Sequence, residues 1–204
     1  MALAPQYLKG SIEAGCDEAG RGCLAGPVVA AAVILPPRVR LPGLDDSKKL
    51  NAEQRAELRL LIEERALAWS VAVATTEEID QINILHASFL AMHRAIAALG
   101  MVPQHLLIDG NRFRPYPHIP HTCMIEGDGR FRNIAAASIL AKTHRDAMMM
   151  ELHTRHPEYL WISNKGYPTV EHREALQRLG PTEHHRQSFR LNYSEAELDL
   201  DFAQ

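Results

Sequence analysis

The sequence predicts a single α/β domain, in which a mixed β-sheet carries helices on its faces and a short helical extension follows at the C-terminal end. The chain has 204 residues, which is enough for one sizeable domain with one core. Apolar runs typical of strands alternate with segments of helical periodicity. The early strand candidates are close in sequence and can pair antiparallel, whereas the later ones alternate with helices, which favours parallel crossovers.

Each predicted strand is a short apolar run bounded by glycine, proline or polar residues. The run at residues 26–36 is rich in Val, Ile and Ala and lies between Gly-Pro and Pro-Pro, which is typical of a buried strand. The predicted strands are residues 11–18, 26–36, 69–75, 105–109 and 122–126.

The predicted helices are marked by caps and stops as well as by periodicity. Asn51 is a typical N-cap, Thr169 is another, and Gly100, Pro157 and Gly180 are typical stops. The predicted helical segments are residues 52–67, a turn at 75–80 followed by 84–100, then 131–156 and 169–180. We therefore expect one domain over residues 1–204, made of a core at about 12–160, a C-terminal helical segment at about 161–190 and an acidic tail at 191–204.

The composition is that of a soluble globular protein, with 46% hydrophobic and 23% charged residues. No run of eighteen apolar residues predicts a membrane span, and the N-terminal residues lack the pattern of a signal peptide. The three cysteines, Cys16, Cys23 and Cys123, do not form a disulfide framework. These features predict a reduced, cytoplasmic location.

The net charge of −3 argues mildly against a nucleic-acid partner. However, the last twelve residues contain four acidic residues and no basic one, so the rest of the chain is slightly positive. Basic residues gather in several short segments between residues 45 and 190. Any one of these segments, taken alone, is typical of a solvated surface.

Four carboxylates stand at strand ends or beside glycines. Asp17 and Glu18 end the first predicted strand and precede a Gly-Arg-Gly segment. Successive side chains on a regular strand point to opposite faces, so both can serve one site only if the strand ends or twists there, which glycine permits. Asp109 ends another apolar run and Asp128 lies between two glycines, and either one alone is typical of a turn or cap. Spacing alone leaves open whether the four meet.

If these acids converge, their mutual repulsion and desolvation require a counter-charge, and a hard divalent cation such as Mg²⁺ or Mn²⁺ supplies it. Two such ions about 4 Å apart can hold an attacking water and a leaving oxygen across a phosphodiester, so that no protein nucleophile is needed. The chain contains no Gly-x-Ser-x-Gly segment and no P-loop. The sequence thus favours metal-assisted phosphodiester hydrolysis.

Six segments together resemble the ribonuclease HII family, in the family's order and over about residues 12–190. The resemblance implies a ribonuclease H-like fold and a metal-dependent endonuclease. Its substrates would be the RNA strand of RNA–DNA hybrids and single ribonucleotides embedded in duplex DNA, cut on the 5′ side to leave 5′-phosphate and 3′-hydroxyl ends. The segments are residues 17–35, 45–50, 106–111, 127–146, 164–169 and 172–189.

The resemblance also implies roles for individual residues. Asp17, Glu18 and Asp109 would be catalytic metal ligands for Mn²⁺ or Mg²⁺, and Asp128 would be the fourth acid of the site. The family commonly has a lysine two residues before that fourth acid, where this chain has Glu126. Local positive charge is therefore lost beside Asp128.

The segment Gly20, Arg21, Gly22 matches the one with which the family recognises the ribose 2′-hydroxyl, and Tyr167 matches the tyrosine at the ribose–deoxyribose junction. The residue types suit these roles. A 2′-hydroxyl distinguishes RNA from DNA at one nucleotide, and glycine lets a backbone approach a sugar closely. Without the resemblance, the Lys-Gly-Tyr-Pro segment would be an ordinary turn.

Basic and small residues suggest where phosphates bind. Ser138, Lys142 and Arg145 follow one another at spacings of four and three, so they share a helix face that can meet a phosphate backbone. Lys48 and Lys49 are expected to do the same. The alanines around Ser138 are explained more simply by tight packing of a helix on a sheet.

Two other functions remain open on the sequence. One is a non-catalytic hybrid-binding protein, although a binder of phosphates gains nothing from clustered acids. The other is a metal-dependent DNA junction nuclease. We expect a monomer without a membrane partner, and we find no clamp-binding peptide in the acidic tail, which leaves contact with a sliding clamp open.

Overall fold

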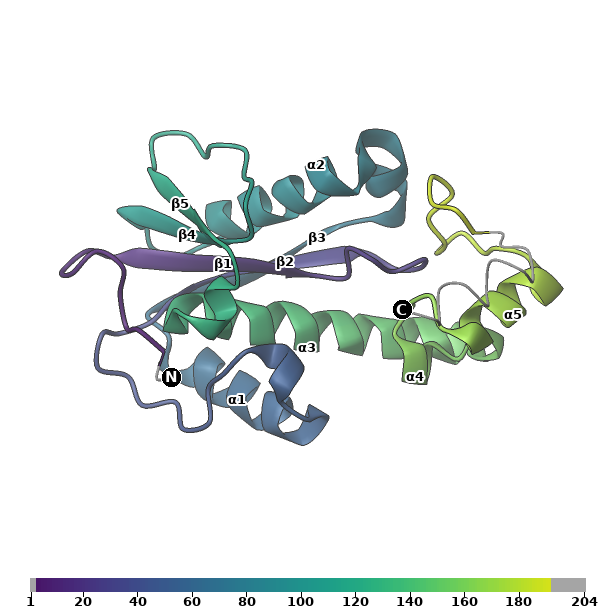
Figure 1. The fold of residues 1–204 in the computed structure, drawn as a ribbon, viewed down its shortest axis with the longest axis horizontal. Helices are drawn as coiled ribbons and strands as arrows, with labels where there is room; N and C mark the ends of the chain where they lie inside the picture. Colours follow the sequence, from purple (N-terminus) through teal and green to yellow (C-terminus); the bar gives the residue numbers. More distant parts are fainter. Residues whose placement is uncertain (1–2, 192–204) are drawn as a thin grey trace.

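The computed structural model describes residues 3–191, and Figure 1 shows a five-stranded sheet covered by helices on both faces. The strands are β1 (Glu13–Ala19), β2 (Val28–Ile34), β3 (Ala68–Ala74), β4 (His105–Asp109) and β5 (His121–Met124). The helices are α1 (Ala52–Arg65), α2 (Thr76–Ala97), α3 (Arg132–Arg155), α4 (Trp161–Asn164) and α5 (Val170–Leu179). Short 3-10 helices are η1 (Ser47–Lys49), η2 (Gly127–Gly129) and η3 (Pro157–Tyr159). The predicted acidic tail lies outside the described residues from 192 onward.

The sheet is mixed, as predicted, with the order β3-β2-β1-β4-β5. β1, β2 and β3 pair antiparallel, whereas β4 and β5 join β1 in parallel. The parallel strands are connected through α2 and through a long loop, whereas β1 and β2 need only a short connection. β1 therefore lies at the centre, where the antiparallel and parallel halves meet.

Both faces of the sheet are buried, which explains why β2 is apolar throughout rather than alternating. Val28 and Ile34 pack in one cluster with the buried side of α2. Ala31 and Val33 point the other way and pack in a second cluster with α1 and α3. Each fully buried Val or Ile side chain contributes roughly 1.5–3 kcal/mol of transfer free energy, so β2 anchors both layers.

Helix α3 lies unusually close to the sheet. A Cβ atom at Gly15 of β1 would be 2.2 Å from the backbone of Asn133, so only glycine fits at this position. The first half of α3 is lined by buried alanines, which confirms that the run of small residues serves close packing: Ala135, Ala136, Ala137 and Ala141. This close approach brings the polar residues of α3 to the end of β1.

Several predicted helix caps are present. Asn51 forms a capping box with Gln54 at the start of α1, and the Thr169 hydroxyl accepts from the amide of His172 at the start of α5. The predicted interruption between residues 80 and 84 occurs at Asn83, which has a non-helical backbone (φ 64°, ψ 164°) inside α2. Thr75 and Glu78 add a second capping box before that kink.

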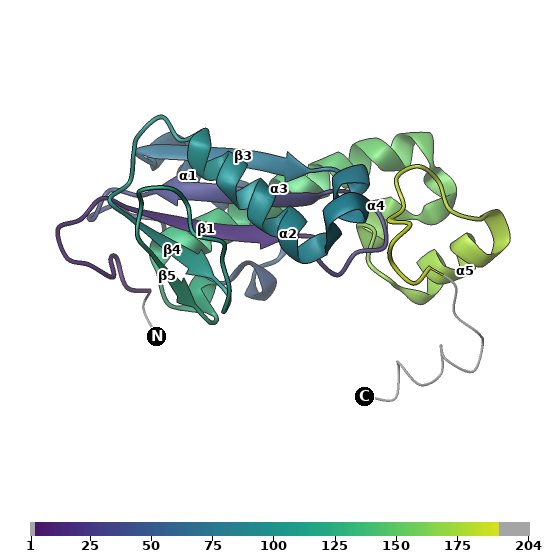
Figure 2. The ribbon, with the colours of Figure 1, turned by 90° about the horizontal axis from the view of Figure 1, so that it is seen from above.

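The C-terminal extension lies beyond one end of the sheet, and α3 runs from beneath the sheet into it (Figures 1 and 2). Its small core contains Met149 of α3 together with Tyr159 and Trp161. Residues 180–191 contain no helix, and His185 forms an isolated antiparallel bridge with Ala25. The extension is thereby joined to the loop that follows β1.

Candidate active site

The end of β1 is left uncovered on one side, and this creates the site. β4 runs parallel to β1 with Cys16 opposite Ile108, and it ends one residue later at Asp109. β1 continues to Ala19 while still paired with β2. β1 therefore does not end at Asp17 and Glu18, and an end was one of the two ways, an end or a twist, in which sequence reasoning allowed both to serve one site. Both instead line one cleft because the neighbouring strand stops.

The cleft has a volume of about 330 Å³ and opens between the end of the sheet, α3 and the C-terminal extension. Most residues predicted for the site line it: Asp17, Glu18, Gly20, Arg21, Gly22, Lys48, Asp109, Ser138, Lys142 and Tyr167. Its lining also includes Ala19, Ser47 and Arg55, which sequence reasoning missed. Residues from six separate segments therefore meet here.

Asp109 positions the fourth acid. Its Oδ1 accepts a hydrogen bond of 2.8 Å from the amide of Gly127, which begins η2. Asp128, the next residue, is 4% exposed, and its Oδ1 accepts from the Gly129 amide at 3.0 Å. Asp128 does not line the cleft itself, but its Oδ2 lies 3.8 Å from the ammonium of Lys48, which does.

Burial and mutual repulsion act on these carboxyl groups together. Burial raises the pKa of Asp17 well above its usual value, and the nearby charges of Glu18 and Asp109 raise it further. Burial also raises the pKa of Glu18, although Arg21, whose Nη1 is 3.1 Å from Glu18 Oε1, opposes that shift. The pKa of Asp128 is raised to about 6 by burial, by Asp109 and by Asp46. The cluster is therefore strained by its own negative charge.

A divalent cation fits this donor set. The converging groups are carboxylates, the ligands that Mg²⁺ and Mn²⁺ prefer. Asp128 Oδ2 is buried and has no hydrogen-bond partner among the described residues, and the Lys48 ammonium lies 3.8 Å from it. Hydrogen bonds from the amide of Glu18 to Asp17 Oδ1 at 2.7 Å and from the amide of Gly127 to Asp109 Oδ1 at 2.8 Å hold two of the carboxylates in place.

Lysine charges partly compensate the acids. Burial alone would lower the pKa of Lys48. The negative charges of nearby aspartates have the larger effect, so the pKa of Lys48 is raised overall; these are Asp128, Asp46, Asp17 and Asp109. Lys49 is the next residue along η1, yet its ammonium pairs with Asp45 at 3.2 Å and does not line the cleft. Of the two lysines predicted to meet phosphates, the structure brings only Lys48 into the site.

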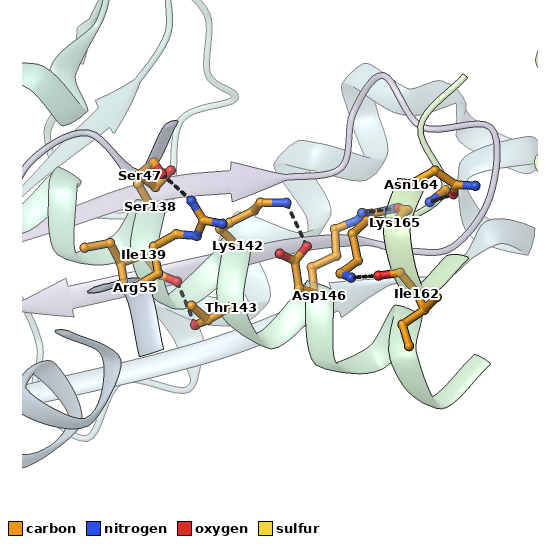
Figure 3. A network of polar contacts seen from close by, with 12 residues as sticks. Ser47, Arg55, Ser138, Ile139, Lys142, Thr143, Asp146, Ile162, Asn164 and Lys165 are labelled. Carbon is orange, nitrogen blue, oxygen red and sulfur yellow. Dashed lines mark hydrogen bonds and ion pairs between the residues drawn. The ribbon is translucent and has the colours of Figure 1, made fainter. Parts of the chain in front are cut away.

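Lys142 reaches the cleft from α3. Its Nζ donates to Asp146 Oδ1 at 2.8 Å, and Figure 3 shows this contact along the helix. The same ammonium lies 5.7 Å from the centre of the Tyr167 ring. Tyr167 itself is 38% exposed, so part of the ring faces the cleft. This arrangement places an ammonium group beside an aromatic ring at the edge of the cleft.

The prediction that Arg145 binds a phosphate is wrong. Its side chain is fully buried, and its guanidinium donates to the carbonyl oxygens of Pro27, Lys165 and Ala25 at 2.9, 2.8 and 3.0 Å. Helical spacing correctly placed it on the face of Lys142, but that face passes under the extension before it reaches residue 145. Arg145 therefore holds the protein backbone together.

Ser47 and Arg55 were missed because neither has a distinctive pattern. The Ser47 hydroxyl is 2.9 Å from that of Ser138, which links η1 to α3 (Figure 3). Arg55 on α1 donates to the carbonyl oxygens of Ser47 at 2.9 Å and of Leu50. Ser47 lies within the Asp-Asp-Ser-Lys-Lys-Leu segment that carries the resemblance, whereas Arg55 offered no signal. Together they fix the loop that presents Lys48.

The histidines of the extension do not form a ready metal site. Among the described residues, His156, Glu183 and His184 bring three ligand atoms within 4.8 Å of one another. Ligands around one tetrahedral zinc ion at 2.0–2.2 Å are only about 3.4 Å apart. The Glu183 side chain is also largely exposed. Exposed acidic groups of this kind are common without an ion, so we assign no metal to these residues.

Removing one buried charge is expected to stabilise the metal-free protein. A carboxyl whose pKa is higher in the folded than in the unfolded chain costs stability as the pH rises through that interval, because the folded state then binds more protons. Asp17→Asn should raise the melting temperature in EDTA at pH 8 by about 3 °C. The gain should shrink at pH 4, where the wild-type group is protonated, and in Mg²⁺, which stabilises the wild type.

Thermal unfolding followed by circular dichroism measures this effect. Asp45→Asn is the matched control, because the Asp46 amide and Lys49 lower the pKa of exposed Asp45 and its removal should bring no gain. An Asp17→Asn protein that melted below the wild type in EDTA at pH 8 would show that the acids are not under electrostatic strain.

Comparison with known proteins identifies the family. The family model of ribonuclease HII matches residues 14–196. The chain is 58% identical over 200 residues to ribonuclease HII of Phocaeicola vulgatus, covering 98% of this chain and 100% of that one. The chain belongs to the ribonuclease HII family. It is accordingly a ribonuclease H, an endonuclease that acts on RNA–DNA hybrids by hydrolysing phosphodiester bonds.

Solved structures of this and a related family share the fold. The structure of a complex of PCNA with ribonuclease HII from Archaeoglobus fulgidus superposes with a TM-score of 0.76 at 25% identity, covering 90% of this chain and 97% of that one. The structure of Bst ribonuclease HIII in complex with Mn²⁺ superposes with a TM-score of 0.70 at 19% identity, covering 100% of this chain and 74% of that one. Within residues 3–191, no helix combines the length and apolar character needed to cross a membrane.

Proposed function

We propose that this ribonuclease HII cuts on the 5′ side of single ribonucleotides embedded in duplex DNA, as well as within the RNA strand of hybrids. The observation that carries the proposal is a single cleft that joins Asp17, Glu18 and Asp109 to a Gly-Arg-Gly segment and to the exposed ring of Tyr167. The acids can hold a cation, and the other two features suit a sugar and a base pair. Hydrolysis at a single ribonucleotide requires that the metal-binding acids and the groups that recognise the sugar lie in the same cleft.

Asp17, Glu18 and Asp109 would hold Mn²⁺ or Mg²⁺, and Asp128 would complete the set. The bound ions would supply an activated water and neutralise the leaving oxygen, giving 5′-phosphate and 3′-hydroxyl ends. The contribution of the chain is to keep the ligands in place: the Gly127 amide orients Asp109, and the Glu18 amide orients Asp17. The Mn²⁺ complex of the similar ribonuclease HIII supports a divalent ion of this type.

The remaining residues of the cleft would recognise the substrate. The backbone of Gly20, Arg21 and Gly22 would contact the 2′-hydroxyl, and Tyr167 would stack at the junction between ribose and deoxyribose. Lys48 and Lys142 would bind phosphates, giving affinity that falls with salt. The net charge of −3 makes such local cations necessary for a polyanionic substrate.

We further propose a single-domain monomer that works in the cytoplasm. The free thiols of Cys16, Cys23 and Cys123 suit a reducing compartment. The Archaeoglobus fulgidus relative occurs in a complex with PCNA, and a pull-down with a purified sliding clamp tests whether this chain makes such a contact. Residues 192–204, where we found no clamp-binding peptide, lie outside the described structure.

One assay tests the proposal. Matched duplexes with and without a single ribonucleotide are incubated with the enzyme in Mg²⁺, Mn²⁺ or chelator, and the ends are mapped on a sequencing gel. We expect one cut on the 5′ side of the ribonucleotide, dependent on the metal, and an intact all-DNA duplex. Binding without a cut in any metal would instead indicate a non-catalytic hybrid binder. Equal cutting of both duplexes, or of a DNA junction alone, would indicate a DNA nuclease.

A further inference from the structure

A second buried arginine, Arg186, reaches the segment proposed to recognise the ribose. Its side chain is fully buried, and its guanidinium donates to the carbonyl oxygens of Gly20 at 2.6 Å, Arg21 at 2.8 Å and Gly26 at 2.9–3.0 Å. Arg186 comes from the non-helical end of the extension, 165 positions from Arg21 along the chain. One side chain thus gathers three carbonyl groups of the loop after β1.

This guanidinium is an expensive group to bury. Burial lowers the pKa of Arg186 to about 10, so the side chain still carries its charge at neutral pH. Within residues 3–191 it forms no ion pair with a carboxylate, and carbonyl oxygens solvate it instead. The Phe189 ring also lies 5.1 Å from the guanidinium carbon. A buried cation whose hydrogen bonds all go to backbone carbonyls constrains those carbonyls strongly, because turning any one away would leave charge unsatisfied.

The orientation of the carbonyls fixes the orientation of the amides. The described peptide bonds are trans, and in a trans peptide unit the N–H points opposite to the C=O. With the Gly20 and Arg21 carbonyls turned toward Arg186, the N–H groups of Arg21 and Gly22 point away from it. Gly20, Arg21 and Gly22 also line the cleft, whereas Arg186 is not among the residues that line it. Neither N–H has a hydrogen-bond acceptor among the described residues.

The backbone around Arg186 is itself fixed to the same loop. Its amide donates to the Leu24 carbonyl at 2.9 Å, and the Gly26 amide donates to the His184 carbonyl at 2.8 Å. Asp80 of α2 holds the following residues, because its carboxylate accepts from the amides of Gln187 and Ser188 at 2.9 Å. The guanidinium therefore approaches the loop from a rigid base.

We propose that Arg186 is the positioning residue for ribonucleotide selectivity: it orients the peptide units of Gly20–Arg21 and Arg21–Gly22 so that two amide donors face the 2′-hydroxyl. This inference deepens the proposed function and rests on it. Arg186 itself touches neither substrate nor metal. The extension thus serves the specificity of the site, and not only its stability.

Arg186→Gln and Arg186→Lys test the proposal under single-turnover conditions, with a duplex containing one ribonucleotide as substrate and the matched all-DNA duplex as a competitive inhibitor. Arg186→Gln should lower the maximal cleavage rate about 100-fold, the usual cost of a misplaced binding group. Its inhibition constant for all-DNA duplex should stay within about twofold, because no phosphate contact is lost. Arg186→Lys keeps the charge without the planar fork, so a loss of about tenfold is expected.

Ile96→Ala is the matched control for stability. Ile96 is buried at the far end of α2 and its truncation should lower the melting temperature while both kinetic constants stay unchanged. If circular dichroism shows that Arg186→Gln is unfolded, the same two constants measured for Arg186→Lys decide the question. A folded variant that cleaves at the wild-type rate overturns the proposal. A folded variant whose maximal cleavage rate and affinity for all-DNA duplex fall by the same factor also overturns the proposal, because equal losses indicate a purely structural role.

The wild-type reaction separates this proposal from the function on which it rests. A wild-type enzyme that left the ribonucleotide duplex intact would refute the proposed function before any variant is compared. A wild-type enzyme that cuts it, beside an Arg186→Gln protein that cuts equally well, would refute the role of Arg186 alone.

Discussion

Asp17→Asn should abolish cleavage of a ribonucleotide-containing duplex while leaving duplex binding largely intact. Asp17 is 6% exposed, lies near the charge of Asp109, and accepts a hydrogen bond from the Glu18 amide. An amide keeps the shape and the hydrogen bonds but loses the charge that attracts a divalent cation. Metal-ion catalysis contributes several kcal/mol to such reactions, so we expect a loss of at least about 1,000-fold in kcat.

Binding should persist because the phosphate contacts come from other side chains. Lys48 and Lys142 keep their charges, and removing an acid does not weaken attraction to a polyanion. Fluorescence anisotropy measures the duplex Kd, and calorimetry with Mn²⁺ should show weakened ion binding. Asp45→Asn, which removes an acid outside the cleft, should leave both rate and affinity unchanged. Native-rate cleavage by a correctly folded Asp17→Asn protein would exclude the acidic cluster as the catalytic centre.

Gly20→Ala should lower the cleavage rate about 100-fold by displacing the loop that we propose recognises the ribose. Gly20 has φ +95°, a conformation that alanine adopts only with strain. The added Cβ would lie 1.9 Å from Nε of Arg145. That guanidinium cannot move aside cheaply, because its hydrogen bonds to three carbonyl groups hold it in place.

Two other glycine variants identify the cause of the loss. Gly22→Ala meets no protein atom within 4 Å, so any loss that it shows comes from contact with the substrate. Gly100→Ala, also in open space but distant from the cleft, should behave as the wild type. Steady-state kinetics on the single-ribonucleotide duplex measures all three. Equal rates for Gly20→Ala and Gly100→Ala would show that the loop conformation does not matter for cleavage.

The positions of strands, helices and acids were predictable because their signals are local. Period-2 and period-3.6 patterns, the Asn51 cap and the buried alanines of α3 depend on residues within a few positions of one another. The mixed pairing followed from the lengths of the connections. Even so, the way in which Asp17 and Glu18 share a cleft was not local, because it depends on β4 ending at Asp109.

The basic residues show where such reasoning fails. Lys142 and Arg145 differ by one helical turn, and both looked like phosphate ligands. Lys142 lies in the cleft, whereas the extension covers Arg145 completely. Lys48 and Lys49 are adjacent, yet only Lys48 faces the acids. The charge of a residue and its spacing along a helix indicate which contacts its side chain can make, but they do not predict which groups surround it in the folded protein.

By itself, the sequence determined the secondary-structure elements, the candidate acids and the family, because each of these is recognised from residues that are close together along the chain. Only the tertiary structure decided which cations line the cleft and which bind backbone carbonyl groups. Arg186 reaches Gly20 across 166 positions of the chain, and a contact of that span leaves no periodicity to detect. Burial decides the role of a charge, and burial is a property of the packed chain.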